Sequence, residues 1–251
     1  MPASPPSSAR RLLLAAVFVA ASMPAASWSQ PARLVASGKP ASERRELADF
    51  RALHLKADFK VVVEPGGGPG VELRGDDNLL GAVETRIVEA EGSPRTLELR
   101  WRDGVSVAGK RPVTVVVGAT QLGAIAISGS GHVEGRGLAG DSLALAVAGS
   151  GAIELKAIQQ GEVTVTIAGS GDVELEGRAS RLSASIAGSG EVEAERLEAD
   201  TVAVKIAGSG DASVLARQSL AVSIVGSGNV RHRGAATPEV SIAGNGKVSR
   251  R

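Results

Sequence analysis

Apolar residues alternate with small or polar residues through the C-terminal half of the chain, and the alternation restarts every 18–20 residues. Each restart is marked by a Gly-Ser-Gly triplet, except the last, which is Gly-Asn-Gly. Alternation with a period of two indicates strands that have one buried and one solvated face. The residue two places before each triplet is always aliphatic: Ile127, Val147, Ile167, Ile186, Ile206, Ile224 and Ile242.

The near-constant period of the triplets predicts a solenoid, in which each repeat buries its apolar face against the next. Antiparallel hairpins are the alternative, but they give the turns no reason to stay alike. In a stack, glycine permits a sharp corner and places no Cβ between coils, while the serine hydroxyls form a hydrogen-bonded ladder. We therefore predict an all-β fold, a single-stranded right-handed parallel β-helix with ~20-residue coils. Its structural corners are Gly129, Gly131, Gly149, Gly151, Gly169, Gly171, Gly188, Gly190, Gly208, Gly210, Gly226, Gly228, Gly244 and Gly246.

Four segments are expected along the chain. Residues 1–29 have the pattern of a signal peptide, because Arg10 and Arg11 precede an apolar run that is shorter than the ~20 residues a membrane span needs. Residues 30–44 are polar and lack periodicity, so they are predicted to be a flexible leader. Residues 45–118 carry irregular strand patterns and are predicted to form N-terminal β-coils or a cap, followed by the regular β-helix of seven repeats over residues 119–251.

Charge and cysteine content exclude several classes of protein. Residues 1–29 hold two arginines and no acid, so the rest of the chain carries 26 basic and 27 acidic residues. Lysine and arginine form no long run, so no nucleic-acid partner is expected, and no transmembrane span is expected after signal cleavage. Cysteine is absent, which excludes disulfides, thiolate chemistry and cysteine-ligated metals.

The repeated Ile-Ala-Gly-Ser-Gly-x-Val unit, with Asp49–Leu53 and Gly75–Leu80 before it, resembles the putative auto-transporter adhesin head GIN domain family. The resemblance covers residues 48–249. It implies an exported bacterial β-helix protein, periplasmic or on the cell surface. It supplies no activity, cofactor or catalytic residue.

An acidic ladder is the main candidate for binding chemistry. Three residues after the triplets stand Glu134, Glu154, Glu174 and Glu193. Stacked about 4.8 Å apart, these carboxylates are expected to raise one another's pKa. The ladder suits a divalent cation, a basic partner or polysaccharide chemistry, and it equally suits a solvated face that resists aggregation.

Other candidate chemistry is weaker. His54, His132 and His232 lie far apart in the sequence, so they are expected at the surface or the rim, and no metal site, cofactor or catalytic residue is predicted. The Gly-rich loop at residues 66–70 lacks the Gly-Lys-Ser/Thr ending of a phosphate-binding loop.

These features favour a non-enzymatic exported β-helix that presents repetitive surfaces for binding, adhesin-like, to an envelope protein or a glycan, with a homo-oligomer as a further option. One alternative is a carbohydrate-active β-helix that acts on acidic polysaccharide through the paired carboxylates of Glu174 and Glu193. Another is a periplasmic scaffold for a protein partner.

Overall fold

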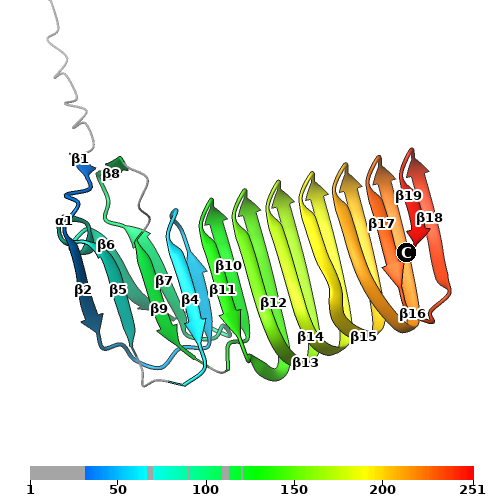
Figure 1. Cartoon of the computed structure of the whole chain (residues 1–251), viewed down its shortest axis with the longest axis horizontal. Helices are drawn as coiled ribbons and strands as arrows, with labels where there is room; N and C mark the ends of the chain where they lie inside the picture. The colour runs from blue at the N-terminus through cyan, green and yellow to red at the C-terminus, as the bar shows by residue number, and fades with distance from the viewer. Residues whose placement is uncertain (1–31, 67–69, 90, 109–112, 120) are drawn as a thin grey trace, which may run out of the picture. The chain divides into compact units, whose positions relative to one another are not determined.

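The computed structural model describes residues 32–66, 70–89, 91–108, 113–119 and 121–251; the predicted signal peptide lies outside these ranges. Within them the chain is almost entirely β-strand, and the one helix is α1 (Asp77–Leu80). From β10 onward the strands stack as successive coils of a parallel β-solenoid (Figure 1). The predicted fold class is thereby confirmed.

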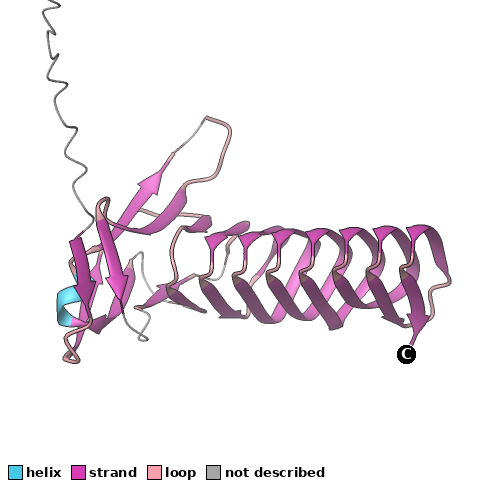
Figure 2. Ribbon diagram, turned by 90° about the horizontal axis from the view of Figure 1, so that it is seen from above, coloured by secondary structure: helices cyan, strands magenta, loops and turns pink. Residues whose placement is uncertain are grey.

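Two layers of parallel strands meet at the Gly-Ser-Gly corners. Figure 2 shows the coils repeating along the solenoid. The first layer contains β7 (Thr96–Trp101), β3 (Ala52–Leu55), β10 (Ala124–Gly129), β12 (Ala139–Gly149) and β18 (Pro238–Gly244). The second contains β9 (Thr114–Gly118), β4 (Lys60–Glu64), β11 (His132–Arg136), β17 (Asn229–Arg233) and β19 (Lys247–Arg250). Long strands that bend through a second corner serve both layers: β13 (Ala152–Gly169), β14 (Asp172–Gly188), β15 (Glu191–Gly208) and β16 (Asp211–Gly226).

The corners depend on glycine in two ways. The first glycine of every triplet has a positive φ, and a Cβ on Gly149 would stand 2.5 Å from the carbonyl oxygen of Gly129 in the preceding coil. A Cβ on Gly151, the third glycine of its triplet, would stand 2.6 Å from Cγ2 of Ile127. The backbone carries the ladder at the corner, since the amide of Ser150 donates to the oxygen of Gly129 at 3.0 Å. The predicted ladder of serine hydroxyls is wrong, because no hydrogen bond between corner hydroxyls is found among the described residues.

The core consists of the aliphatic residues that the alternation places inward. Ile127 and its counterparts as far as Ile224 are buried, as are the columns that contain Leu145 and Val173. In the last coil the same positions are open to solvent, with Val240 46% and Ile242 40% exposed. The solenoid core therefore has an uncovered C-terminal end.

Antiparallel strands close the N-terminal end. β2 (Pro40–Arg45) pairs with β5 (Val71–Asp76), β5 pairs with β9, and β6 (Val83–Val88) pairs with β7. A separate parallel pair joins β1 (Ala32–Val35) to β8 (Val105–Ala108). Residues 30–44, predicted to be a flexible leader, thus contain β1 and most of β2, because pairing with segments far along the chain orders these polar residues.

Candidate functional site

An acidic face covers the outward side of the second layer, just after the Gly-Ser-Gly corners. The strand register stacks the four ladder glutamates, Glu134, Glu154, Glu174 and Glu193, on four successive coils. A second column beside them contains Asp172, Glu191 and Asp211. These seven residues are called the acidic face below. Successive side chains of a strand point to opposite faces of the sheet, so residues two apart in the sequence point to the same face. Both columns therefore lie on one surface.

Cations neutralise the beginning of the ladder. Nζ of Lys60 lies 2.7 Å from Oε1 of Glu134, and Lys156 forms an ion pair with Glu154. Arg196 pairs with Glu174. For Glu193, no ion pair is found in the described part of the chain. The acidic face is consequently most negative toward its C-terminal half.

The pKa values of the face follow this distribution. The Lys60 ammonium, which hydrogen-bonds to Glu134, holds the pKa of that carboxyl below its ordinary value. Burial raises the pKa of Glu191, and the negative charges of Glu193, Asp211 and Asp172 raise it further. The predicted rise is wrong for the ladder residue Glu134, where a neighbouring cation lowers the pKa. Repulsion among carboxylates raises the pKa of Glu191 instead, a residue of the second column that was not part of the predicted ladder.

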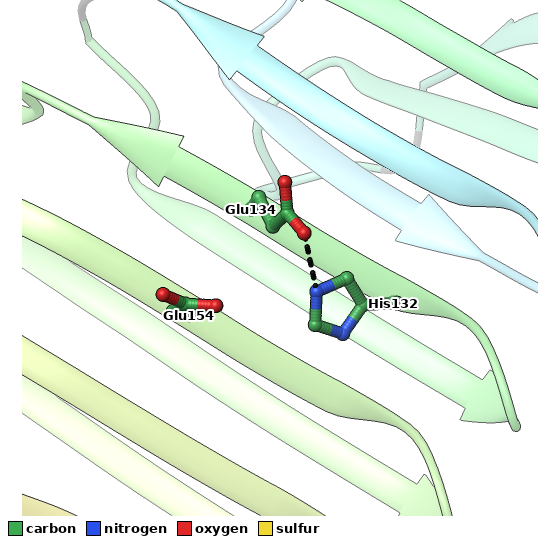
Figure 3. A group of neighbouring side chains, drawn as sticks. All are labelled: His132, Glu134 and Glu154. Atoms are coloured by element: carbon green, nitrogen blue, oxygen red, sulfur yellow. Dashed lines mark hydrogen bonds and ion pairs between the residues drawn. The ribbon is translucent and has the colours of Figure 1, made fainter.

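His132, Glu134 and Glu154 form a cluster at the start of the ladder, shown in Figure 3. One ligand atom from each lies within 4.8 Å of the others, and Nε2 of His132 is 3.0 Å from Oε1 of Glu134. Imidazole and carboxylate groups are ligands that zinc accepts. Lys60 already forms an ion pair with Glu134, so a metal cation bound here would have to displace the Lys60 ammonium.

This cluster was missed in the sequence, although a signal for it exists. His132 and Glu134 are two residues apart, a His-x-Glu spacing that puts both side chains on one face of a strand. The prediction that the histidines lie at the surface or rim is wrong for His232. That residue is 5% exposed, and its Nδ1 has no hydrogen-bond partner within the described residues.

Near the C-terminal end the acidic column is interrupted and then changes sign. Glu193 on β15, Ser213 on β16 and Arg231 on β17 hold equivalent positions on three adjoining strands. A cavity of about 330 Å³ lies over them, and its lining also includes Glu191 and Glu195. Spacing of the triplets did not predict this cavity.

Comparison with known proteins places the chain in a family. The model described as putative auto-transporter adhesin, head GIN domain, matches residues 49–236. The chain belongs to this family. No curated protein sequence matches it, and in the described residues no helix is long and apolar enough to cross a membrane.

Several solved structures share this fold. A putative adhesin from Bacteroides fragilis is 23% identical, with a TM-score of 0.78 over 87% of this chain and 100% of that one. A putative lipid binding protein from Parabacteroides distasonis is 26% identical, with a TM-score of 0.70 over 87% of this chain and 99% of that one. A putative adhesin from the same species is 22% identical, with a TM-score of 0.63 over 87% of this chain and 100% of that one.

Proposed function

We propose that this GIN domain protein is an exported, non-enzymatic binding module of the bacterial envelope, adhesin-like, whose acidic face recognises cationic groups on a partner. The observation that carries this proposal is the register of the second layer. It stacks Glu134, Glu154, Glu174 and Glu193 on successive coils, about 4.8 Å apart.

Repetition supports binding through many weak contacts. Each exposed carboxylate contributes little alone, since exposed ion pairs are worth about 0–1 kcal/mol. Several such contacts made by one partner add up through effective concentration. A partner with regularly spaced ammonium or guanidinium groups, on an envelope protein or a glycan, fits this face. The names of the family and of its structural neighbours agree with a binding role.

Polylysine is a direct probe of the acidic face. We expect it to bind the chain at low ionic strength and to dissociate near 1 M salt, where the Debye length falls to about 3 Å. A variant with Glu154→Gln, Glu174→Gln and Glu193→Gln should lose most of this binding.

The matched control removes three carboxylates elsewhere, with Glu162→Gln, Glu198→Gln and Glu239→Gln. Both variants change the net charge equally. Equal losses in the two variants would mean that overall charge, and not the acidic face, attracts the probe, and the proposed function would be abandoned.

Location is a separate part of the proposal. Protease added to intact cells, with a periplasmic marker as control, distinguishes the two exported locations. Loss of a tag on the chain while the marker survives places the acidic face outside the cell and supports adhesion. Protection of both favours a periplasmic scaffold, and a tag found only in the cytoplasm contradicts export.

A second candidate function is the carbohydrate-active protein that was predicted from Glu174 and Glu193. Arg196 forms an ion pair with Glu174, so the carboxyl that suits the acid of a glycosidase pair is Glu191, which lies beside Glu193 and has a raised pKa. A carbohydrate-active protein would release reducing ends from an acidic polysaccharide. Incubation of the chain with polyuronate tests this directly, and we expect no release.

A further inference from the structure

The strands β15, β16 and β17 run side by side toward the C-terminal end of the solenoid (Figure 1). A hollow with walls of opposite charge lies over them on the acidic face. Glu193, Ser213 and Arg231 occupy the same position on the three strands. Ser213 is 5% exposed although its neighbours in the column are longer side chains with larger exposed fractions. The serine therefore forms the floor, and the longer side chains form the two walls.

Most charges around this hollow already have partners. Arg196 pairs with Glu174, and Nη1 of Arg251 lies 2.8 Å from Oε1 of Glu195. Nη2 of Arg233 approaches the same carboxylate at 3.7 Å. These pairs hold the rim in place without using the inner walls.

The inner walls keep their charges unmatched. In the described part of the chain, no ion pair within 4 Å involves Glu191, Glu193 or Arg231. Glu193 and Arg231 are separated by two strand spacings, which is about 10 Å between backbones. The charge of Arg231 acts on Glu191 and partly offsets the rise of its pKa, but no direct ion pair joins the two walls in the described residues. A ligand that carries both charges can bridge them.

We propose that this hollow binds a small zwitterionic group, with a primary ammonium between Glu191 and Glu193 and a phosphate or carboxylate on Arg231. The inference deepens the proposed function and rests on it, because the ammonium uses two carboxylates of the acidic face. An ammonium has three N–H donors, which suits two carboxylates. A guanidinium forms paired hydrogen bonds with phosphate or carboxylate.

The size of the cavity and the charges of its lining both limit which ligands fit. The cavity, at about 330 Å³, lies at the small end of the range of about 300–1,000 Å³ for ligand pockets. A simple anion would meet the repulsion of two carboxylates, and a simple cation would leave Arg231 without a partner. The raised pKa of Glu191 agrees with an ammonium ligand, since a cation there would relieve the repulsion among the neighbouring carboxylates.

Calorimetric titration of the exported chain with small soluble probes tests the inference. Glycerophosphoethanolamine carries an ammonium and a phosphate, and γ-aminobutyrate carries an ammonium and a carboxylate. We expect at least one of them to bind, and which one binds identifies the anion. Glycerophosphate, ethylamine and glycerophosphocholine lack the ammonium, the anion and the N–H donors respectively, so each should bind at least about tenfold more weakly.

Single substitutions test the contribution of each wall to binding. Glu193→Gln and Arg231→Gln should each lower the affinity for the preferred probe by about tenfold or more. The control Glu162→Gln, which lies outside the hollow, should leave that affinity unchanged. Ser213→Leu keeps both charges and fills the floor, and it should also abolish binding. Circular dichroism checks that each variant is folded. Absence of binding by every zwitterion, or equal binding of a single-charge probe, would overturn the inference.

Polylysine distinguishes this inference from the proposed function. Arg231→Gln removes a cation from the edge of the acidic face, so polylysine should bind this variant as well as the unmodified chain or better, while the zwitterion is lost. Polylysine binding without zwitterion binding refutes the hollow alone. Zwitterion binding without polylysine binding refutes the extended acidic face and leaves a small-ligand site.

Discussion

At its N-terminal end the solenoid is closed by the antiparallel strands β2, β5 and β6, whereas at its C-terminal end the inward side chains of β18 meet solvent. The closed end contains a network in which Glu98, 6% exposed as a side chain, pairs with Lys56 and Arg86. The open end has a buried histidine, His232, and charged residues that fold back on earlier coils. Similar repeats are therefore expected to differ in stability according to what covers them.

The largest expected difference in stability is between two isoleucines that hold equivalent positions before the first and last triplets. Ile127 is buried and Ile242 is 40% exposed, although both lie two residues before a triplet. Ile127→Ala should lower the free energy of unfolding by about 2–5 kcal/mol, and Ile242→Ala by less than about 1 kcal/mol. Denaturant unfolding measures both. Equal costs would show that a second molecule covers the open end.

Ion pairs at the two ends give the next largest difference. Glu98→Gln removes charged hydrogen bonds from a buried acceptor and should cost about 1.5–3 kcal/mol. Glu195→Gln at the open end removes a partly exposed partner of Arg251 and should cost at most about 1 kcal/mol. Thermal unfolding of the two variants tests this order, which a larger loss for Glu195→Gln would contradict.

Acid should loosen the coil that contains His232. Burial and the charge of Arg250 lower the pKa of His232, so the folded coil favours the neutral ring. As pH falls below about 6.5, the unfolded chain takes up the proton first and stability is lost. Hydrogen exchange, corrected for its intrinsic pH dependence, should show falling protection of β17–β19 amides and unchanged protection in β14. His232→Val should remove the effect, and its persistence in that variant would assign it to another group.

The smallest expected changes in stability come from two glutamates of the acidic face, and they have opposite signs. The raised pKa of Glu191 means that its charge destabilises the fold above that pKa, so Glu191→Gln should stabilise the protein at neutral pH by about 0.2–1 kcal/mol. The lowered pKa of Glu134 means stabilisation that is present at neutral pH and lost in acid, so Glu134→Gln should destabilise it by up to about 1 kcal/mol. Urea midpoints at neutral pH report both, and changes of the same sign would contradict the assigned charge environments.

Sequence alone predicted the regular coils because each repeat packs against a copy of itself. The residues two and four places before a triplet meet the same positions in the next coil, so periodicity determines the register and stacks the ladder glutamates. The closed end has no such repeat. β2 is polar, and only its pairing with β5, some distance along the chain, makes it a strand.

The hollow was not predictable from spacing for a related reason. Its floor is the single change from glutamate to Ser213, and its rim depends on Glu195 and Arg196, where the register between β15 and β16 shifts. A bulge places outward side chains where strict alternation does not. The cluster at His132 was accessible from the sequence, since the His-x-Glu spacing alone puts both groups on one strand face.

Titration of the glutamate side-chain carboxyl groups by NMR, with and without polylysine, tests the central claim that the stacked coils create a cation-binding acidic face. The structure predicts a pKa above the ordinary glutamate value for Glu191 and below it for Glu134. Polylysine should lower the pKa of Glu191, because a bound cation favours its charged form. Ordinary pKa values at both residues, unchanged by polylysine, would contradict the account.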